Sequence, residues 1–304
     1  MRLASWHWGG RAHAGTLSPC GRELTPLAVA DATRGVQELL ERLALREALP
    51  AACGPRLPRE AVTLRAPLPR PRRGLFCVGR NYRAHAQELA GTVFRSQMTQ
   101  EDRWPIVFTK LAECVVGPQD EVRLPGAAVS SQIDYEGELA VVIGQGGRDI
   151  PRQRALEHVL GYTVVNDVTA RDVQMRHQQW DLGKSFDSFC PMGPCIVTAD
   201  ELDGQALQVR TWVTPAGGQG RELRQDGRTQ DLIFDIPTLV ETCSRGISLY
   251  PGDIIATGTP AGVGMGFSPP RWLQPGDVVR VEIEGIGALE NRFVDRLADR
   301  ADGR

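Results

Sequence analysis

Short apolar runs separated by glycine and proline dominate the chain from residue 74 onward. They are rich in branched and aromatic residues and end at turn-forming residues, which is typical of β-strands; examples are GLFCVGRN, PIVFTK, ELAVVIG, GYTVVND, PCIVTA, ALQVRTWV, DIIATG and DVVRVEIEGIG. Helical spacing is rare and predicts helices at residues 35–48, 82–89, 152–159 and 236–244. The pattern predicts a β-dominated α+β fold, with a sheet rolled on itself or a compact sandwich, rather than alternating βαβ units.

The first 70 residues have a different pattern. Their apolar pieces are short, and the helix predicted at residues 35–48 has leucines at helical spacing. Residues 65–73 (RAPLPRPRR) are typical of an extended linker. We therefore expect a small N-terminal domain with its linker at residues 1–70 and a main domain at residues 71–304.

Composition narrows the class of protein. The chain has 304 residues and a net charge of −2, so we expect no nucleic-acid partner. Its seven cysteines include no CxxC pair, which favours reduced cytosolic thiols over a disulfide framework or a zinc site. No segment has the pattern of a signal peptide or a membrane span, so we expect a cytoplasmic protein with no membrane partner. Lys110 and Lys184 are the only lysines.

Two glutamates begin the apolar run at residues 134–144 (DYEGELAVVIG). In a β-strand, Glu136 and Glu138 would point to the same face, roughly 6–7 Å apart. Two buried like charges repel unless a cation or a shared proton offsets them, so the pair is a candidate metal site. The alternative is a hydrated strand end where both glutamates pair with arginines.

A second candidate lies at residues 161–174 (GYTVVNDVTARDVQ). Asp167 follows an apolar strand, and a helical turn beginning at Ala170 would place Arg171 and Gln174 on one face. The alternative is that Asp167 is a turn residue and Arg171 its surface partner. A third candidate is Lys184, whose ammonium group would stabilise negative charge in a reaction unless it is a solvated loop residue.

His85 and Glu88 are three residues apart in a predicted helix, so they would be in contact. A carboxylate orients an imidazole and raises its basicity, which suits activation of water. A surface His–Glu pair without function is the alternative. The polar residues 89–104 that follow are a candidate lid. Farther along, the glycine-rich turn in residues 251–266 lacks a phosphate-loop pattern, and its Thr259 is a candidate for binding a substrate carboxylate.

Five segments, in order, resemble the fumarylacetoacetate hydrolase (FAH) family over roughly residues 74–293: GRNYRAHAQE, DYEGELAVVIG, NDVTARDVQ, GKSFDSFCPMGP and PGDIIATGTPAGVG. The resemblance is closest to the FAH-domain-containing branch, which includes acylpyruvases and oxaloacetate decarboxylases. It implies a mixed β-sandwich roll with a small N-terminal domain, a homodimer, and one bound Mg²⁺ or Mn²⁺.

The resemblance also implies roles for individual residues. The metal ligands are Glu136, Glu138 and Asp167, and such an all-oxygen site suits Mg²⁺ or Mn²⁺. The catalytic residues are His85, Glu88 and Lys184. The substrate-binding residues are Arg171, Gln174 and Thr259.

These roles favour a metal-dependent hydrolase that cleaves a carbon–carbon bond in a 3-acylpyruvate or a related β-diketo acid, with a small keto acid as substrate. The same site would also suit an oxaloacetate decarboxylase or an isomerase or decarboxylase of the 2-hydroxyhepta-2,4-diene-1,7-dioate type. A binding protein that has lost turnover is a third hypothesis.

Overall fold

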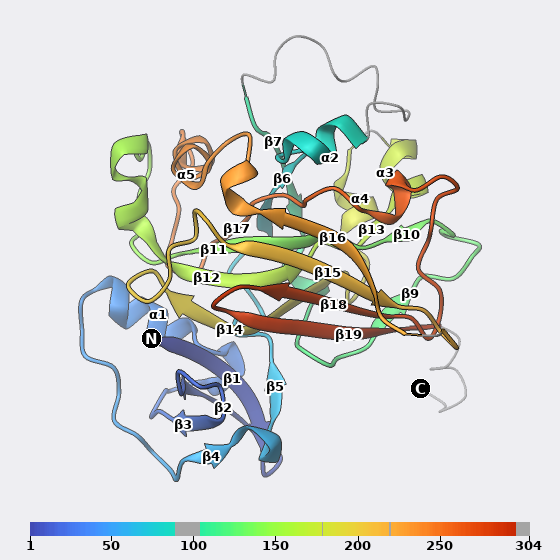
Figure 1. Cartoon of the computed structure of the whole chain (residues 1–304). Coiled ribbons are helices and arrows are strands. Elements are labelled where there is room, and N and C mark those ends of the chain that lie inside the picture. Colours follow the sequence, from blue (N-terminus) through green and yellow to red (C-terminus); the bar gives the residue numbers. More distant parts are fainter. Residues whose placement is uncertain (89–103, 178, 219, 296–304) are drawn as a thin grey trace.

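A computed structural model describes residues 1–88, 104–177, 179–218 and 220–295 (Figure 1). The α-helices are α1 (Gln37–Ala44), α2 (Arg83–Glu88), α3 (Arg171–His177), α4 (Asp181–Lys184) and α5 (Ile236–Ser244). The 3₁₀ helices are η1 (Ala32–Arg34), η2 (Arg59–Ala61), η5 (Ala112–Cys114), η6 (Arg152–His158), η7 (Thr229–Asp231) and η8 (Gly264–Gly266). The strands are β1 (Arg2–Trp8), β2 (Arg11–Leu17), β3 (Glu23–Pro26), β4 (Leu57–Pro58), β5 (Thr63–Arg65), β6 (Leu75–Gly79), β7 (Ile106–Lys110), β8 (Val115–Val116), β9 (Val122–Leu124), β10 (Ile133–Asp134), β11 (Gly137–Ile143), β12 (Val159–Asn166), β13 (Thr169–Ala170), β14 (Cys190–Thr198), β15 (Gln208–Thr214), β16 (Glu222–Arg228), β17 (Ile254–Ala256), β18 (Val278–Ile283) and β19 (Gly287–Asp295).

Two large mixed sheets form the body of the protein. The larger has the strand order β4-β3-β2-β1-β14-β12-β11-β17-β6-β7, with β5 paired to β1 and β8 paired to β14. The smaller has the order β16-β15-β18-β19-β9, and β10 pairs with β13 separately. The predicted β-dominated α+β fold with few helices is confirmed. No helix within the described residues is long and apolar enough to cross a membrane.

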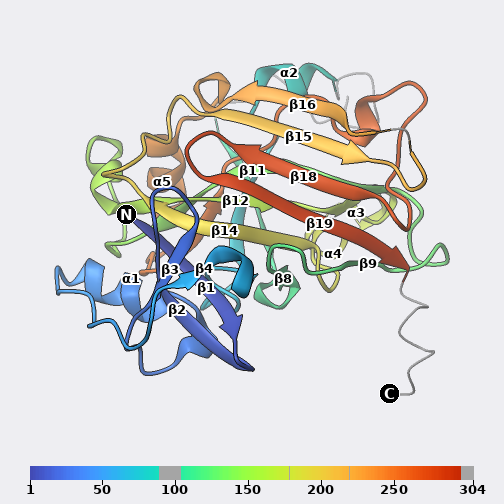
Figure 2. The same ribbon diagram turned by 60° about the horizontal axis from the view of Figure 1, so that its bottom comes forward.

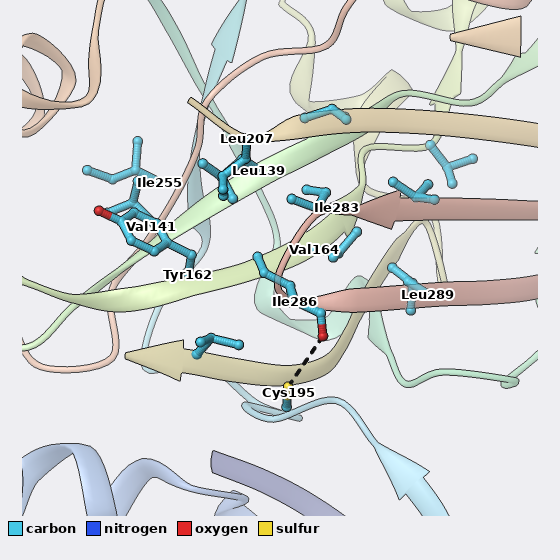
Figure 3. Packing of buried hydrophobic residues seen from close by; sticks show 14 of the residues in the cluster. Leu139, Val141, Tyr162, Val164, Cys195, Leu207, Ile255, Ile283, Ile286 and Leu289 are labelled. Atoms are coloured by element: carbon cyan, nitrogen blue, oxygen red, sulfur yellow. Dashed lines mark hydrogen bonds between the residues drawn. The ribbon is translucent and has the colours of Figure 1, made fainter. Parts of the chain in front are cut away.

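The two sheets stack face to face (Figure 2), with β14 against β19 and β12 against β18. Strand β11 is buried on both faces, as its continuous apolar run predicts. Its residues Leu139 and Val141 face the interior between the sheets, beside Ile283 from β18 (Figure 3). Ala140 and Val142 belong to a second cluster on the opposite face, which includes leucines of α1.

The N-terminal strands extend the larger sheet instead of forming a separate one. Strand β1 pairs with β14 through Arg2 opposite Val197 and Leu3 opposite Ile196. The segment expected to be an extended linker is packed, since Ala66 and Leu68 are buried and the carbonyl of Pro67 accepts a hydrogen bond from the Val36 amide. The division near residue 70 into two domains stays a prediction.

The candidate site residues lie together at one end of four neighbouring strands of the larger sheet, β12, β11, β17 and β6. Because β11 runs antiparallel to both β12 and β17, its beginning lies beside their ends. Because β6 is parallel to β17, the end of β6 lies beside the end of β17. The register therefore brings together residues 80–81, 136–138, 167 and 257–259.

Two local predictions need correction. The strand expected to carry both Glu136 and Glu138 begins only at Gly137, so Glu136 lies between β10 and β11. The Glu136 amide donates to the side-chain oxygen of Asn166 at 3.0 Å instead of joining a strand ladder. The helix predicted at residues 152–159 is a 3₁₀ helix, η6, which ends at His158.

Candidate active site

Three carboxylates and one ammonium group form the centre of the site. Glu136, Glu138 and Asp167 are buried, and each offers an oxygen within 4.8 Å of the other two. Lys184 ends helix α4, and its Nζ lies 2.7 Å from Oε2 of Glu136 and 2.7 Å from Oδ2 of Asp167. Lys184 is 1% exposed, so the alternative of a solvated loop lysine is wrong.

The other lysine, Lys110, contacts the same centre through Asp167. It is completely buried at the end of β7, and its Nζ lies 2.8 Å from Oδ1 of Asp167. The same ammonium donates to the carbonyl oxygens of Val168 and Lys184. Although burial lowers the pKa of Lys110, Asp167 reverses the effect and raises it, so the ammonium stays charged. Lys110 therefore fixes both Asp167 and the backbone that carries Lys184.

Arg171 is the first residue of helix α3 and joins the centre to a fourth buried carboxylate, that of Asp134. Its guanidinium lies 2.6 Å from Oε1 of Glu136 and 2.9 Å from Oδ2 of Asp134. It also donates to Oε1 of Gln174 at 3.3 Å, so Arg171 and Gln174 share one face as predicted from their spacing. Asp134 in turn accepts hydrogen bonds from the amides of Gly264 and Met265. Arg171 is buried, so the alternative of a surface partner for Asp167 is wrong.

Glu136 and Glu138 differ in their electrostatics. Burial raises the pKa of Glu136, but the ion pairs with Lys184 and Arg171 outweigh it and lower that pKa to about 2. Glu138 accepts a hydrogen bond from the Gly258 amide at 2.8 Å. Within the described part of the chain, no ammonium or guanidinium group lies at ion-pair distance from it. Burial, followed by the charges of Asp167 and Glu136, raises the pKa of Glu138 well above its usual value.

These residues fit a divalent cation. The three donors are carboxylate oxygens, the ligands that hard cations such as Mg²⁺ and Mn²⁺ prefer. A buried carboxylate without a positive partner, as in Glu138, is costly unless it is protonated or a cation binds beside it. The triad could therefore hold a metal ion.

A histidine and a glutamate lie at the rim of the same cavity. Nδ1 of His85 is 3.0 Å from Oε2 of Glu88, as their spacing in helix α2 predicts. The other carboxylate oxygen of Glu88 accepts from the Gly262 amide at 2.9 Å. His85 is 3% exposed, so the pair is not on the surface. A Cβ on Gly266 would lie 2.1 Å from Oε1 of Glu88, which shows how closely the glycine-rich turn encloses this carboxylate.

The hydroxyl of Thr259 is already engaged. It donates to the carbonyl of Gly137 at 3.0 Å and accepts from the side chain of Gln225 at 2.7 Å. Gln225 also accepts from the Gly137 amide. Thr259 thus anchors the start of β11 while it lines the cavity.

A single cavity brings most of the predicted residues together. Phe108 and Trp180 form an aromatic wall, with ring centroids 5.2 Å apart. Seven predicted residues line the cavity, while Glu88 and Asp167 contact that lining through His85 and Lys184; the seven are His85, Glu136, Glu138, Arg171, Gln174, Lys184 and Thr259. The candidate lid lies outside the described residues except for Trp104.

Two residues of this network were not predicted from the sequence. Lys110 was noticeable as one of two lysines, but its own segment gave no sign of a partner. Asp134 heads the DYEGE segment, yet only the two glutamates were singled out there.

Comparison with known proteins identifies the family. Residues 74–294 match the family described as "Fumarylacetoacetate (FAA) hydrolase C-terminal". The chain is 47% identical over 233 residues to oxaloacetate tautomerase YisK of Bacillus subtilis, covering 76% of this chain and 73% of that protein. It is 44% identical over 247 residues to the human mitochondrial oxaloacetate tautomerase FAHD2A, covering 80% and 73%.

Solved structures agree over almost the whole chain. The fumarylacetoacetate hydrolase of Exiguobacterium antarcticum superposes with a TM-score of 0.83 at 41% identity, covering 97% of this chain and 100% of that one. A 2-hydroxyhepta-2,4-diene-1,7-dioate isomerase from Mycobacterium marinum gives 0.75 at 34% identity, covering 97% and 99%. The fold and the site define an enzyme with a buried acidic centre that could bind a metal. The chain belongs to the fumarylacetoacetate hydrolase family.

Proposed function

We propose that this protein is a metal-dependent enzyme that interconverts the enol and keto forms of oxaloacetate or a closely related 2-oxo dicarboxylic acid. The observation that carries the proposal is the single cavity lined by Glu136 and Glu138 of the triad together with Lys184 and His85. Relatives 47% and 44% identical to this chain are named oxaloacetate tautomerases, which favours this reaction over the others that the cavity suits.

The residues proposed to hold the ion are Glu136, Glu138 and Asp167, and the ion proposed is Mg²⁺ or Mn²⁺. When bound, a divalent ion supplies Lewis-acid stabilisation of the negative charge that develops on the oxygens of a 2-oxo acid. Lys184, which lies 2.7 Å from two of these carboxylates, would add a second positive charge at the same place.

Side chains of the protein would transfer the proton. In the reaction a proton is lost from the enol oxygen at C2 and one is gained at C3, so the composition of the substrate does not change. With Nδ1 of His85 held by Glu88, Nε2 is the ring nitrogen that would exchange a proton with C3. Arg171 and Gln174 would orient the 2-oxo acid end, and Thr259 would hold the turn beside it.

Hydrolysis of a 3-acylpyruvate is the second candidate function. The 3.0 Å contact between His85 and Glu88 favours it, because a histidine oriented by a carboxylate is suited to activating water. Decarboxylation of oxaloacetate needs no such base.

Three substrates distinguish these reactions. Purified protein with Mg²⁺ or Mn²⁺ is mixed with freshly dissolved enol oxaloacetate, with acetylpyruvate and with a 2-hydroxy-dienedioate, and the ultraviolet absorbance and products are followed. We expect faster decay of the enol of oxaloacetate without release of CO₂, and loss of that acceleration with a chelator. Cleavage of acetylpyruvate without an effect on enol oxaloacetate would overturn the proposal in favour of hydrolysis.

We further propose that the enzyme is a homodimer and acts in the cytoplasm. Measuring its mass in solution by light scattering tests the first of these.

A further inference from the structure

We propose that Phe108 is a positioning residue for Lys184, because the face of its ring would keep the ammonium group in place when a cation binds the neighbouring carboxylates. Nζ of Lys184 lies over the ring of Phe108, 4.9 Å from the ring centroid. A cation at this distance is attracted to the face of an aromatic ring. The inference rests on the proposed function in one respect, since it takes Lys184 as a group that stabilises negative charge on the substrate.

Strand β7, which carries Phe108, fixes helix α4 at both ends. The amide and the hydroxyl of Thr109 donate to Oδ1 of Asp181, the first residue of the helix, at 3.3 and 2.6 Å. The Leu111 amide donates at 3.1 Å to the hydroxyl of Ser185, which directly follows the helix. Because β7 is the last strand of the larger sheet, these amides bond to the segment of α4 instead of to a further strand. The strand therefore fixes the backbone on which Lys184 stands.

The side chains of β7 also reach Lys184. Phe108 and Lys110 are two residues apart in the strand, so they point to the same face. Lys110 donates to the carbonyl of Lys184, and Phe108 faces the ammonium of the same residue. Trp180 packs against the ring of Phe108 at an angle of 64°, and a Cβ on Gly79 would lie 2.3 Å from the ring of Trp180. The aromatic wall is thus packed closely against the backbone of β6.

The ring differs from the carboxylate partners of Lys184 in its response to a metal ion. The ammonium lies 2.7 Å from oxygens of Glu136 and Asp167, which are two of the proposed metal ligands. A divalent cation at these carboxylates would repel the ammonium and compete with it for their oxygens. The face of Phe108 attracts the ammonium whether or not that cation is bound. Phe108 would therefore keep Lys184 beside the substrate in the metal-loaded enzyme.

Lysine labelling observes this contact directly, because Lys110 and Lys184 are the only lysines of the chain. In protein labelled with ¹³C at the ε-carbon of lysine, a Lys184→Arg variant assigns the two NMR signals. The face of an aromatic ring shields the protons above it. We therefore expect the ε protons of Lys184 to be shielded relative to those of Phe108→Leu, both without metal and with Mg²⁺.

A fluorine series separates the attraction for the cation from packing. Phe108 is replaced by phenylalanines with one, two or three fluorine atoms, which nearly keep the shape of the ring while withdrawing negative charge from its face. We expect kcat with enol oxaloacetate to fall stepwise, by about 2- to 30-fold at the end of the series, with little change in KM. The affinity of the Mg²⁺-loaded protein for oxalate, which resembles the enolate of a 2-oxo acid, should fall in the same order. Calorimetry measures this affinity.

The same series at Phe189 is the matched control. Phe189 is completely buried, and its ring packs against that of Phe186 with centroids 5.3 Å apart. It should leave kcat and the affinity for oxalate unchanged. Thermal unfolding checks that each variant is folded, and the fluorine series provides the comparison if Phe108→Leu is not.

Two results would overturn the inference. One is a Lys184 signal that loses its shielding when Mg²⁺ binds to the wild type, and the other is an affinity for oxalate that does not follow the fluorine series. Neither measurement needs turnover. A failure of the proposed tautomerisation is therefore distinguishable from a failure of the role of Phe108.

Discussion

Nζ of Lys110 lies 2.8 Å from Oδ1 of Asp167, and neither side chain is accessible to solvent. The ion pair joins strand β7 to the residue that follows strand β12, and these two strands are not neighbours in the sheet. It therefore couples the stability of the protein to the position of a proposed metal ligand.

Replacing Lys110 should destabilise the fold. Lys110→Met would remove one of the two ammonium groups that face the buried Asp167 carboxylate and would take the same donor from two buried carbonyl oxygens, so we expect the free energy of unfolding to fall by about 3–5 kcal/mol. Denaturant unfolding measures this change. Arg210→Met is the control, because the Arg210–Asp226 pair is exposed and its loss should cost no more than about 1 kcal/mol. Equal effects of the two substitutions would contradict the prediction.

The raised pKa of Glu138 predicts opposite effects of pH on the metal-free and metal-bound protein. Above the ordinary glutamate pKa of about 4.3, the folded metal-free protein keeps a proton that the unfolded chain has released. Its stability should therefore fall as the pH rises toward the pKa of the folded state. Metal binding needs the carboxylate, so affinity should increase with pH and a proton should be released. Calorimetry in buffers of different ionisation enthalpy measures that proton.

Glu138→Gln separates these two effects. The amide resembles the protonated acid, so we expect the metal-free variant to be at least as stable as the wild type at pH 8. Metal affinity should fall by more than about 100-fold, because the variant lacks a direct ligand. Normal metal affinity in Glu138→Gln would exclude this residue from the metal site.

Removing the imidazole of His85 should slow catalysis without affecting the metal. We expect His85→Ala to lower kcat by about 10²- to 10⁴-fold, the usual contribution of a general acid or base. Calorimetry with Mn²⁺ should give an unchanged Kd. His7→Ala, in an exposed position on β1, should have wild-type activity. Full activity in His85→Ala would remove His85 from the mechanism.

A substitution at Gly266 would test indirectly the contact between His85 and Glu88. A Cβ at this position would lie 2.1 Å from Oε1 of Glu88, so Gly266→Ala should displace the carboxylate and loosen its hold on His85. We expect a fall in kcat of about 10-fold or more with little change in stability, because the displaced group is the end of a flexible side chain. In a Glu88→Gln background the substitution should have almost no further effect on kcat, and additive losses would contradict the proposed link.

Where local signals in the sequence are strong, they predicted the helices and strands well. Helix α5 has the predicted bounds, and Asp235 caps it by accepting from the Thr238 amide. Strand β11 is buried on both faces as its apolar run predicts. The break before Gly137 was not predictable, because it depends on a hydrogen bond to Asn166, thirty residues away.

The residues of the candidate site were predictable from the sequence, but the contacts between residues far apart in the chain were not. The spacing of His85 and Glu88, and of Arg171 and Gln174, indicated which side chains meet within one helix. The partner of Lys110 is 57 residues away and depends on the sheet order, which no local pattern specifies.

The pairing of β1 with β14 has a consequence for folding. Without residues 1–65, the stretch of β14 that contains Ile196 and Val197 would present open backbone amides and carbonyls beside exposed apolar surface. The N-terminal strands therefore act as a cap against association between sheet edges. A chain truncated before residue 66 should precipitate or form large oligomers in light scattering, although every proposed active-site residue is present.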